Sequence, residues 1–183
     1  MSQQEMKVIP DHIIKKVIFA LIITLVGTTG VMFFMGTFSK PTLEFKVTDP
    51  YRLAYISHTG PYNNIDGLIE ELRVKMDEAN VEVIDAAVLF LDDASEVKLE
   101  DQQSKVGFII PVNVRVPDEF EIMDIPSSKK LVGTFNGGAL MGSYRTYPAM
   151  QEWAASKGKR LSLPALEIYH GKSSVEYHMA IVD

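Results

Sequence analysis

The chain of 183 residues contains no cysteine. This absence excludes disulfide bonds, thiolate metal sites and a thiol nucleophile, and it is compatible with either side of a membrane. Basic residues are also few, because 18 Lys and Arg stand against 24 Asp and Glu and leave a net charge of −6. Non-specific binding to nucleic acid requires a basic surface that displaces phosphate counterions. The charge therefore predicts no nucleic-acid partner.

Hydrophobic residues make up 46% of the chain and charged residues 23%, which is typical of a globular protein and not of a disordered one. The length allows one ordinary domain and an appendage. The appendage is residues 17–35, VIFALIITLVGTTGVMFFM, a stretch that lacks any charge. At 1.5 Å per residue it reaches nearly across a hydrocarbon core of about 30 Å.

Two other interpretations of this stretch are weaker. A signal peptide has a shorter apolar region and small residues at a cleavage site, and a buried helix of a soluble domain rarely lacks every charge. We expect a single-pass membrane anchor at residues 17–35, after a tail at 1–16 and before a short linker at 36–41. The pair Lys15–Lys16 favours a cytoplasmic N-terminus, which would leave the following domain on the non-cytoplasmic side.

Residues 42–183 contain an internal repeat at an offset of 78 residues. Arg52–Tyr62, RLAYISHTGPY, aligns with residues 130–140, KLVGTFNGGAL. The same offset pairs Leu89 with Glu167 and Leu91 with Tyr169. Each unit, at about 42–114 and 119–183, is predicted to contain strands, a glycine turn and one helix. Neither unit has enough apolar surface for a core of its own, so we expect them to share one sheet or a common seam.

The hydrophobic pattern places two main helices in this region. The first is predicted to begin at Asn63 or Asn64 and to run to about Asn80, with a buried stripe of Ile65, Leu68, Ile69, Leu72 and Met76. The second is predicted at about 147–157, because Pro148 is tolerated best in the first turn of a helix. Strands are predicted at 43–47, 53–56, 86–91, 106–110, 131–135, 165–169 and 175–181.

Four segments carry a resemblance to a known family: HTGPY (58–62), VGFIIPV (106–112), IPSSKKLVGTFNG (125–137) and PALEIYHG (164–171). In their order and spacing they resemble the GyrI-like, or AraC effector-binding, superfamily. The resemblance covers residues 43 to 183 and implies an α+β fold of duplicated, SHS2-like βαββ units with an antiparallel sheet. It also implies binding of small molecules that are often cationic or amphipathic. His170–Gly171–Lys172 departs from the Asp–Pro-like turn that is frequent in the family.

The resemblance implies that Glu167 is a pocket glutamate, with Tyr169 on the same strand face. A glutamate in an otherwise apolar strand can also face solvent or pair with a basic residue. A buried carboxylate either binds a cation or has a raised pKa, and aromatic faces strengthen the capture of a cation. The candidate aromatic walls are Tyr55, Tyr62, Tyr144, Tyr169 and Phe108, of which Tyr62 and Tyr169 are favoured.

Other functions are weaker predictions. His58, His170 and His178 have no metal-ligand spacing, and no catalytic residue or cofactor is predicted. We therefore expect a membrane-anchored module that binds small molecules. The alternatives are a hydrolase of strained electrophiles that uses Glu167 and Tyr169, and a protein-interaction domain such as a gyrase inhibitor or an adaptor.

Overall fold

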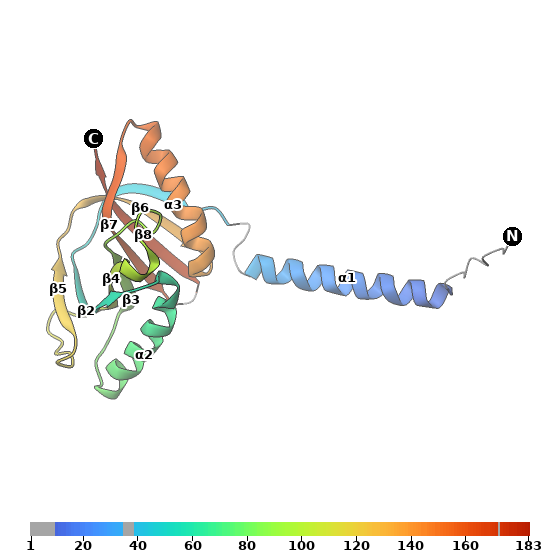
Figure 1. Cartoon of the computed structure of the whole chain (residues 1–183), viewed down its shortest axis with the longest axis horizontal. Helices are drawn as coiled ribbons and strands as arrows, with labels where there is room; N and C mark the ends of the chain where they lie inside the picture. Colours follow the sequence, from blue (N-terminus) through green and yellow to red (C-terminus); the bar gives the residue numbers. More distant parts are fainter. Residues whose placement is uncertain (1–9, 35–38, 172) are drawn as a thin grey trace. The chain divides into compact units, whose positions relative to one another are not determined.

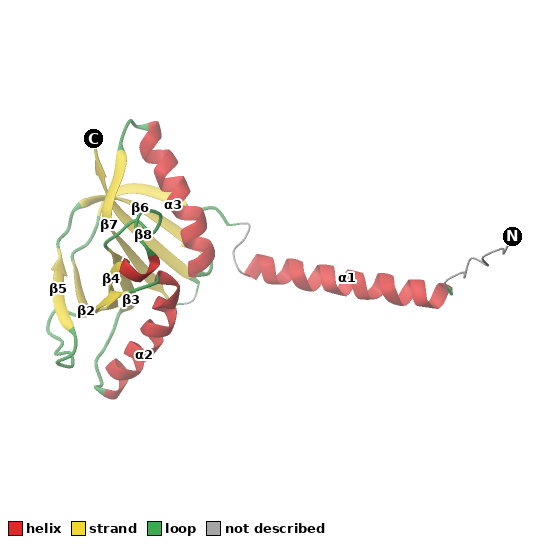
Figure 2. Cartoon of the chain, viewed as in Figure 1, coloured by secondary structure: helices red, strands yellow, loops and turns green. Residues whose placement is uncertain are grey.

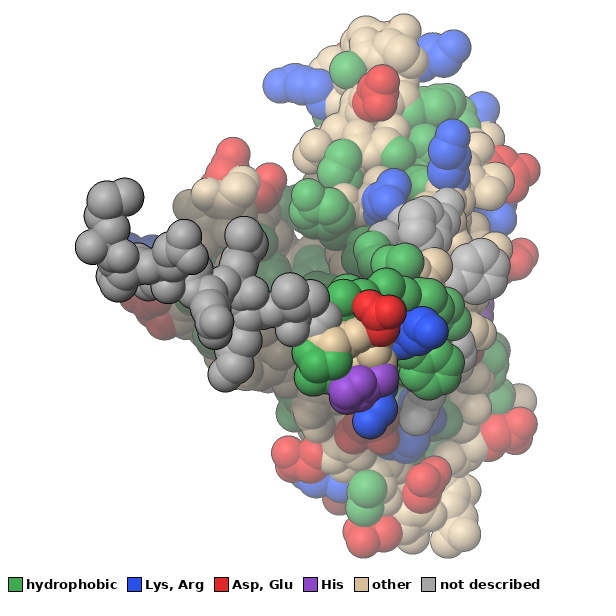
Figure 3. All heavy atoms as spheres, turned by 90° about the vertical axis from the view of Figure 1, so that its right-hand side faces the viewer, with side chains coloured by type: hydrophobic (Ala, Val, Ile, Leu, Met, Phe, Trp, Pro, Cys, Tyr) green, Lys and Arg blue, Asp and Glu red, His purple; other side chains and the backbone are tan. Residues whose placement is uncertain are grey.

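The computed structural model describes residues 10–34, 39–171 and 173–183, and the chain divides into two compact units, residues 1–38 and 39–183. The described part of the first unit is one helix, α1 (Asp11–Phe34), which is long and apolar enough to cross a membrane. It begins within the predicted tail, so Lys15 and Lys16 are helical. Figure 3 shows charged side chains and a histidine beside hydrophobic ones near the start of this helix. Residues 1–9 of the predicted tail and residues 35–38 of the predicted anchor and linker lie outside the described residues.

The described residues of the second unit form eight strands and two α-helices (Figures 1 and 2). Two short 3₁₀ turns, at Tyr62–Asn64 and Leu99–Asp101, lie between these elements. In chain order the elements are β1 (Thr42–Val47), β2 (Tyr51–Thr59), α2 (Ile65–Glu78), β3 (Asp85–Phe90), β4 (Gln103–Ile109), β5 (Glu121–Ile125), β6 (Lys129–Asn136), α3 (Ala139–Ser156), β7 (Arg160–His170) and β8 (Ser174–Val182).

All eight strands form one antiparallel sheet in the order β1-β6-β8-β7-β3-β4-β2-β5. The order is symmetric about the junction of β7 and β3, because each half supplies the same four strands in mirrored positions. The predicted α+β fold and the shared sheet are confirmed. Each half also has one strand more than the predicted βαββ unit, and this first strand pairs with the other half: β1 with β6, and β5 with β2.

Both helices of the second unit lie against the same face of the sheet (Figure 1). The predicted stripe of α2 is confirmed, since Ile65, Ile69, Leu72 and Met76 are buried against β2, β3 and β4 and Leu68 is half-buried. Helix α3 covers β6, β7 and β8. A second apolar layer, with Leu53, Leu89 and Ile168 among its members, lies on the opposite face of the sheet.

The predicted start of the second helix is wrong. Helix α3 begins at Ala139, eight residues before Tyr147, and Pro148 lies in its interior. Proline removes one backbone hydrogen bond, which would otherwise run to the carbonyl of Tyr144. The loss is offset by a buried face that extends through both sides of the proline, with Gly142, Thr146, Met150 and Ala154 at a spacing of four residues.

The predicted equivalence of Leu89 and Glu167 as matched inward positions of the repeat is also wrong, because the two side chains lie on opposite faces of the sheet. Leu89 belongs to the layer on the face away from the helices, and its ladder partner in β7 is Leu166. Glu167 lies opposite Val88, which packs beneath α2. Because side chains alternate between the two faces of a strand, an offset that is one residue out exchanges the faces.

Candidate functional site

Glu167 lies in the middle of β7 on the face that carries the helices. Its neighbours along the strand, Leu166 and Ile168, belong to the apolar layer on the opposite face. Only 3% of Glu167 is exposed. Its ladder partners are Val88 on β3 and Tyr177 on β8, which places it next to the junction of the two halves. The side chain is therefore directed into the interior beneath α3.

Three hydroxyl groups surround the carboxylate of Glu167. Tyr147 donates a hydrogen bond of 2.7 Å to Oε1, and Tyr169 donates one of 2.7 Å to Oε2. Ser143 lies at 3.5 Å from Oε1. Tyr147 and Ser143 occupy successive turns of α3, whereas Tyr169 lies two residues further along β7. A buried carboxylate is costly unless such bonds satisfy it, and here both oxygens are satisfied.

Burial dominates the ionisation of this group. Removal of the carboxylate from water raises the pKa of Glu167 from 4.5 to about 7, and the charge of Asp66 contributes in the same direction. The hydrogen bonds from Tyr147, Tyr169 and Ser143 lower this pKa and so limit the rise. Burial and the nearby carboxylate also raise the pKa of Tyr147 and Tyr169 well above the usual value, so both remain donors. The glutamate can therefore exchange a proton near neutral pH.

Gly142 provides the space for this arrangement. A methyl group at its Cα would come within 2.3 Å of the Tyr177 hydroxyl and 3.2 Å of the Phe135 ring. The Tyr177 hydroxyl donates to the carbonyl of Ala139 at 3.3 Å, and its ring meets that of Tyr147 edge-on at 5.2 Å. Helix α3 can approach the tyrosine layer this closely because the position lacks a side chain.

A cleft of about 300 Å³ opens beside this cluster. Ala86, Tyr169 and Val175 contribute to its lining from the sheet, and Ala139 does so from the start of α3. Helix α2 contributes Ile69 together with the charged residues Asp66, Glu70 and Arg73. Tyr169 both lines the cleft and bonds to Glu167, so it connects the open space to the buried carboxylate.

The structure brings two of the predicted site residues together and places a third nearby. Tyr169 and Glu167 are hydrogen-bonded. Tyr62 lies on the same face of the sheet, where its ring meets Phe90 edge-on at 4.7 Å, and Phe90 packs in the same apolar clusters as Tyr169. The Tyr62 hydroxyl donates to the carbonyl of Gln103 at 2.9 Å.

Three predicted walls do not meet Glu167. Tyr55 lies on the opposite face of the sheet, where its hydroxyl donates to Glu121 and accepts from Lys105, both at 2.9 Å. Phe108 is fully buried, and the guanidinium of Arg73 lies 5.1 Å from its ring centre, so an internal cation covers it. Tyr144 is 77% exposed on α3. Alternation along β2 and the helical turn of α3 account for the positions of the two tyrosines.

Sequence reasoning missed Tyr147, Ser143 and Tyr177 as members of the site. A signal was present for the first two, because Ser143 and Tyr147 are four residues apart and share one face of any helix that includes both. That face was hidden by the assumption that Pro148 begins the helix. Tyr177 alternates with Val175 and Met179 in an apolar strand, and nothing in that pattern distinguishes it from ordinary core.

Solved structures share this fold at low sequence identity. The C-terminal domain of EcmrR superposes with a TM-score of 0.63 at 12% identity, covering 79% of this chain and 98% of that one. The Vibrio cholerae integron cassette protein VCH_CASS2 gives 0.57 at 10%, covering 79% and 99%. SAV2435 bound to tetraphenylphosphonium gives 0.53 at 12%, covering 77% and 94%.

No curated protein sequence matches this chain significantly. At such identities the solved structures establish the fold and leave the chemistry of the site to its own residues. A family model, by contrast, matches residues 41–183, which include every strand and both helices of the second unit. The chain therefore belongs to the family of GyrI-like small-molecule-binding domains.

Proposed function

We propose that this domain binds amphipathic organic cations in the cleft between α2 and α3 and that Glu167 supplies the recognising charge. The main support for this proposal is the buried carboxylate of Glu167, which accepts a hydrogen bond from Tyr169, a residue that lines the open cleft. Ala86, Val175 and the tyrosine ring offer apolar contact, and Asp66 and Glu70 add negative charge at the α2 side. SAV2435, which shares the fold, binds a cation of this class.

Tyr169 controls access to the carboxylate in this proposal. A bound cation either rests on the face of the Tyr169 ring or displaces its hydroxyl and approaches Glu167 directly. In both cases the ionised carboxylate is favoured, so binding releases a proton whenever Glu167 was protonated. Because its pKa is about 7, affinity rises as pH rises toward 7 and levels off above it. Below that value it falls by about tenfold per pH unit.

Arg73 opposes cation binding. It lines the same cleft and carries a positive charge. Its guanidinium makes a cation–π contact with the Phe108 ring. The cleft thus combines two acidic residues and one basic residue on α2 with the carboxylate behind Tyr169. Replacing Arg73 by Gln would remove a like charge and is expected to strengthen binding of a cation by a few fold.

Titration with tetraphenylphosphonium tests the proposal. The full chain, reconstituted in lipid nanodiscs, is titrated calorimetrically at pH 8 beside the Glu167→Gln variant, for which partition of the probe into lipid is identical. We expect the variant to bind at least about tenfold more weakly. Tetraphenylborate, of the same shape and opposite charge, serves as the matched probe and should show no difference between the two proteins. Equal affinity of both proteins for the cation would refute the role of Glu167.

We further infer that α1 crosses a membrane once and that the domain lies on the non-cytoplasmic side. The 22 residues Asp11–Met32 are long and apolar enough to cross a membrane, and their length of roughly 33 Å matches a hydrocarbon core. The hydroxyl groups of Thr24, Thr28 and Thr29 each donate a hydrogen bond to the backbone carbonyl four residues earlier. Such bonds satisfy polar groups that lipid cannot. Reporter fusions at the C-terminus test the orientation: activity of a cytoplasmic reporter would overturn it.

A further inference from the structure

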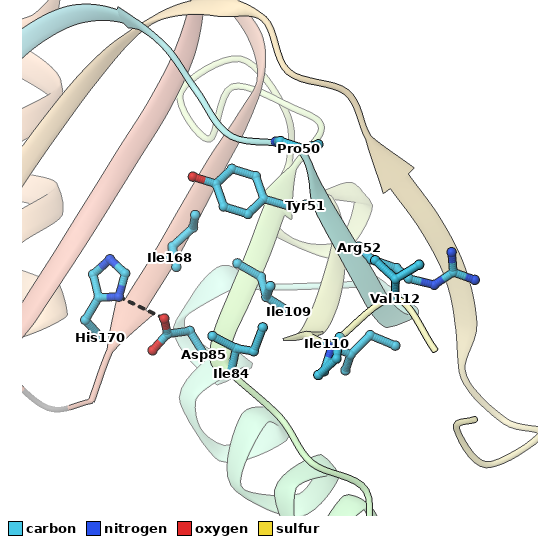
Figure 4. A pocket seen from close by; sticks show the side chains of 11 residues that line it. Pro50, Tyr51, Arg52, Ile84, Asp85, Ile109, Ile110, Val112, Ile168 and His170 are labelled. Carbon is cyan, nitrogen blue, oxygen red and sulfur yellow. Dashed lines mark hydrogen bonds and ion pairs between the residues drawn. The ribbon is translucent and has the colours of Figure 1, made fainter. Parts of the chain in front are cut away.

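A second hollow, of about 330 Å³, lies away from Glu167 at the ends of β2, β3, β4 and β7 (Figure 4). Its apolar lining comes from Ile109 and Ile168, from the exposed Ile84 at the mouth, and from Ile110, which also packs in the core cluster beneath α2. Ile109 and Ile168 belong to the apolar layer on the face opposite α2 and α3. The two hollows therefore share no lining residue and lie against different faces of the sheet.

The polar groups of this hollow gather at one end. Asp85 and His170 lie together, and Ile168 lies between this pair and Tyr51 (Figure 4). His170 donates from Nδ1 to Oδ2 of Asp85 at 2.9 Å. Within the described residues, this is the one hydrogen bond to the Asp85 side chain. A small, mainly apolar hollow with a few convergent polar groups has the character of a ligand site.

The charge at this end is negative. Glu176 lies 4.0 Å from the other nitrogen of His170. Burial raises the pKa of the Tyr51 phenol, and the charges of Glu176 and Asp49 raise it further. At the opposite end the guanidinium of Arg52 points away from the hollow (Figure 4), and its Nη1 lies 3.2 Å from Asp124. A ligand whose polar group enters at this end therefore meets the carboxylate of Asp85, whose Oδ1 can accept a hydrogen bond from it.

We propose that this hollow binds a small primary amine with an aliphatic body, whose ammonium group donates to Asp85 while its chain packs on the isoleucines. The chemistry follows from the lining: a carboxylate accepts from an ammonium group, and a hollow at the lower end of the range for ligand pockets admits a short chain. Ile84 and Val112, which are 59% and 71% exposed, flank the mouth and would be covered by the chain.

Isoleucine methyl groups allow a direct test, because four isoleucines line this hollow and Ile69 alone lines the other. The full chain in nanodiscs, labelled at isoleucine δ1 methyls, is titrated with n-hexylamine, n-hexanol and hexanoate. We expect saturable shifts of the four methyls with hexylamine, binding of hexanol weaker by at least about fivefold, and no saturation with hexanoate. Equal binding of amine and alcohol, or shifts confined to Ile69, would overturn the proposal.

Two variants localise the effect. Asp85→Asn should weaken hexylamine binding by about tenfold, and Ile84→Trp, a change at an exposed position, should close the mouth and abolish it. Gly67→Ala, where an added methyl group meets nothing within 4 Å, is the control and should leave the hexylamine titration unchanged. Binding of hexylamine in the other cleft is followed separately at the Ile69 methyl, so failure at one hollow is distinguishable from failure at the other. Unchanged binding in both Asp85→Asn and Ile84→Trp would refute the site.

Discussion

The buried faces of α2 and α3 differ in size and polarity, although the two helices occupy equivalent places in the two halves. Helix α2 buries Ile65, Ile69, Leu72 and Met76, which fill the space above β3 and β4 with hydrocarbon. Helix α3 buries Gly142, Thr146, Met150 and Ala154, which are smaller on average. The space left beneath α3 is taken by the tyrosines and by Glu167.

This difference shows how one half of a duplicated fold can acquire a site. The sheet supplies the same frame twice, and at its centre Val88 of β3 lies directly opposite Glu167 of β7. Under α2 the position is apolar and needs no partner. Under α3 the carboxylate is supported by hydroxyl groups that only a helix with small buried residues can accommodate.

The largest effect is expected when the glutamate found beneath α3 is introduced at the equivalent apolar position beneath α2. Val88→Glu would place a carboxylate beneath α2, where the two tyrosine hydroxyls of the neighbouring cluster already donate to Glu167 and to the carbonyl of Gln103. We expect a loss of about 3–5 kcal/mol in the free energy of unfolding, measured by urea denaturation of the full chain in nanodiscs. Val88→Thr, similar in shape, is the control and should lose much less. A stable Val88→Glu protein would contradict the comparison.

The next effect concerns the pH dependence of stability. The folded chain retains a proton on Glu167 up to about pH 7, whereas the unfolded chain loses it near 4.5. Stability from this group is therefore full below pH 4.5, declines as pH rises to 7 and is flat above it. Between pH 4 and pH 8 the wild type should lose about 3 kcal/mol more than Glu167→Gln. Parallel pH profiles of the two proteins would show that the carboxyl titrates normally.

The smallest effect is expected for substitutions of two helical glycines, Gly142 on α3 and Gly67 on α2. Gly142→Ala would bring Cβ within 2.3 Å of the Tyr177 hydroxyl and should destabilise the domain by about 1–3 kcal/mol. Gly67→Ala on α2 meets nothing within 4 Å and should stabilise by about 0.5–1 kcal/mol through helix propensity. Urea denaturation followed by the fluorescence of Trp153 measures both. If both variants changed the free energy of unfolding in the same direction, the close approach of α3 to Tyr177 would not require glycine at position 142.

Part of the fold was predictable because local patterns are strong. The stripe of α2 has helical spacing over three turns, and the duplicated strands alternate or run apolar between turn residues. The start of α3 was not predictable from Pro148, because burial of a long helix face outweighs the loss of one backbone hydrogen bond. Tyr55 was assigned to the site by residue type, whereas the alternation of β2 directs it to the other face.

The sequence by itself determined the duplication, the apolar N-terminal helix and the place of Glu167 and Tyr169 on one strand, and its resemblance to a known family implied the fold class and the pocket glutamate. Those features depend on residue type and on spacing within a segment. Tertiary structure alone decided that the first strands exchange between halves, that Tyr147 and Ser143 complete the hydroxyl cluster, and that a second hollow forms on the opposite face. Each of these depends on contacts between segments far apart in the chain, which local periodicity does not encode.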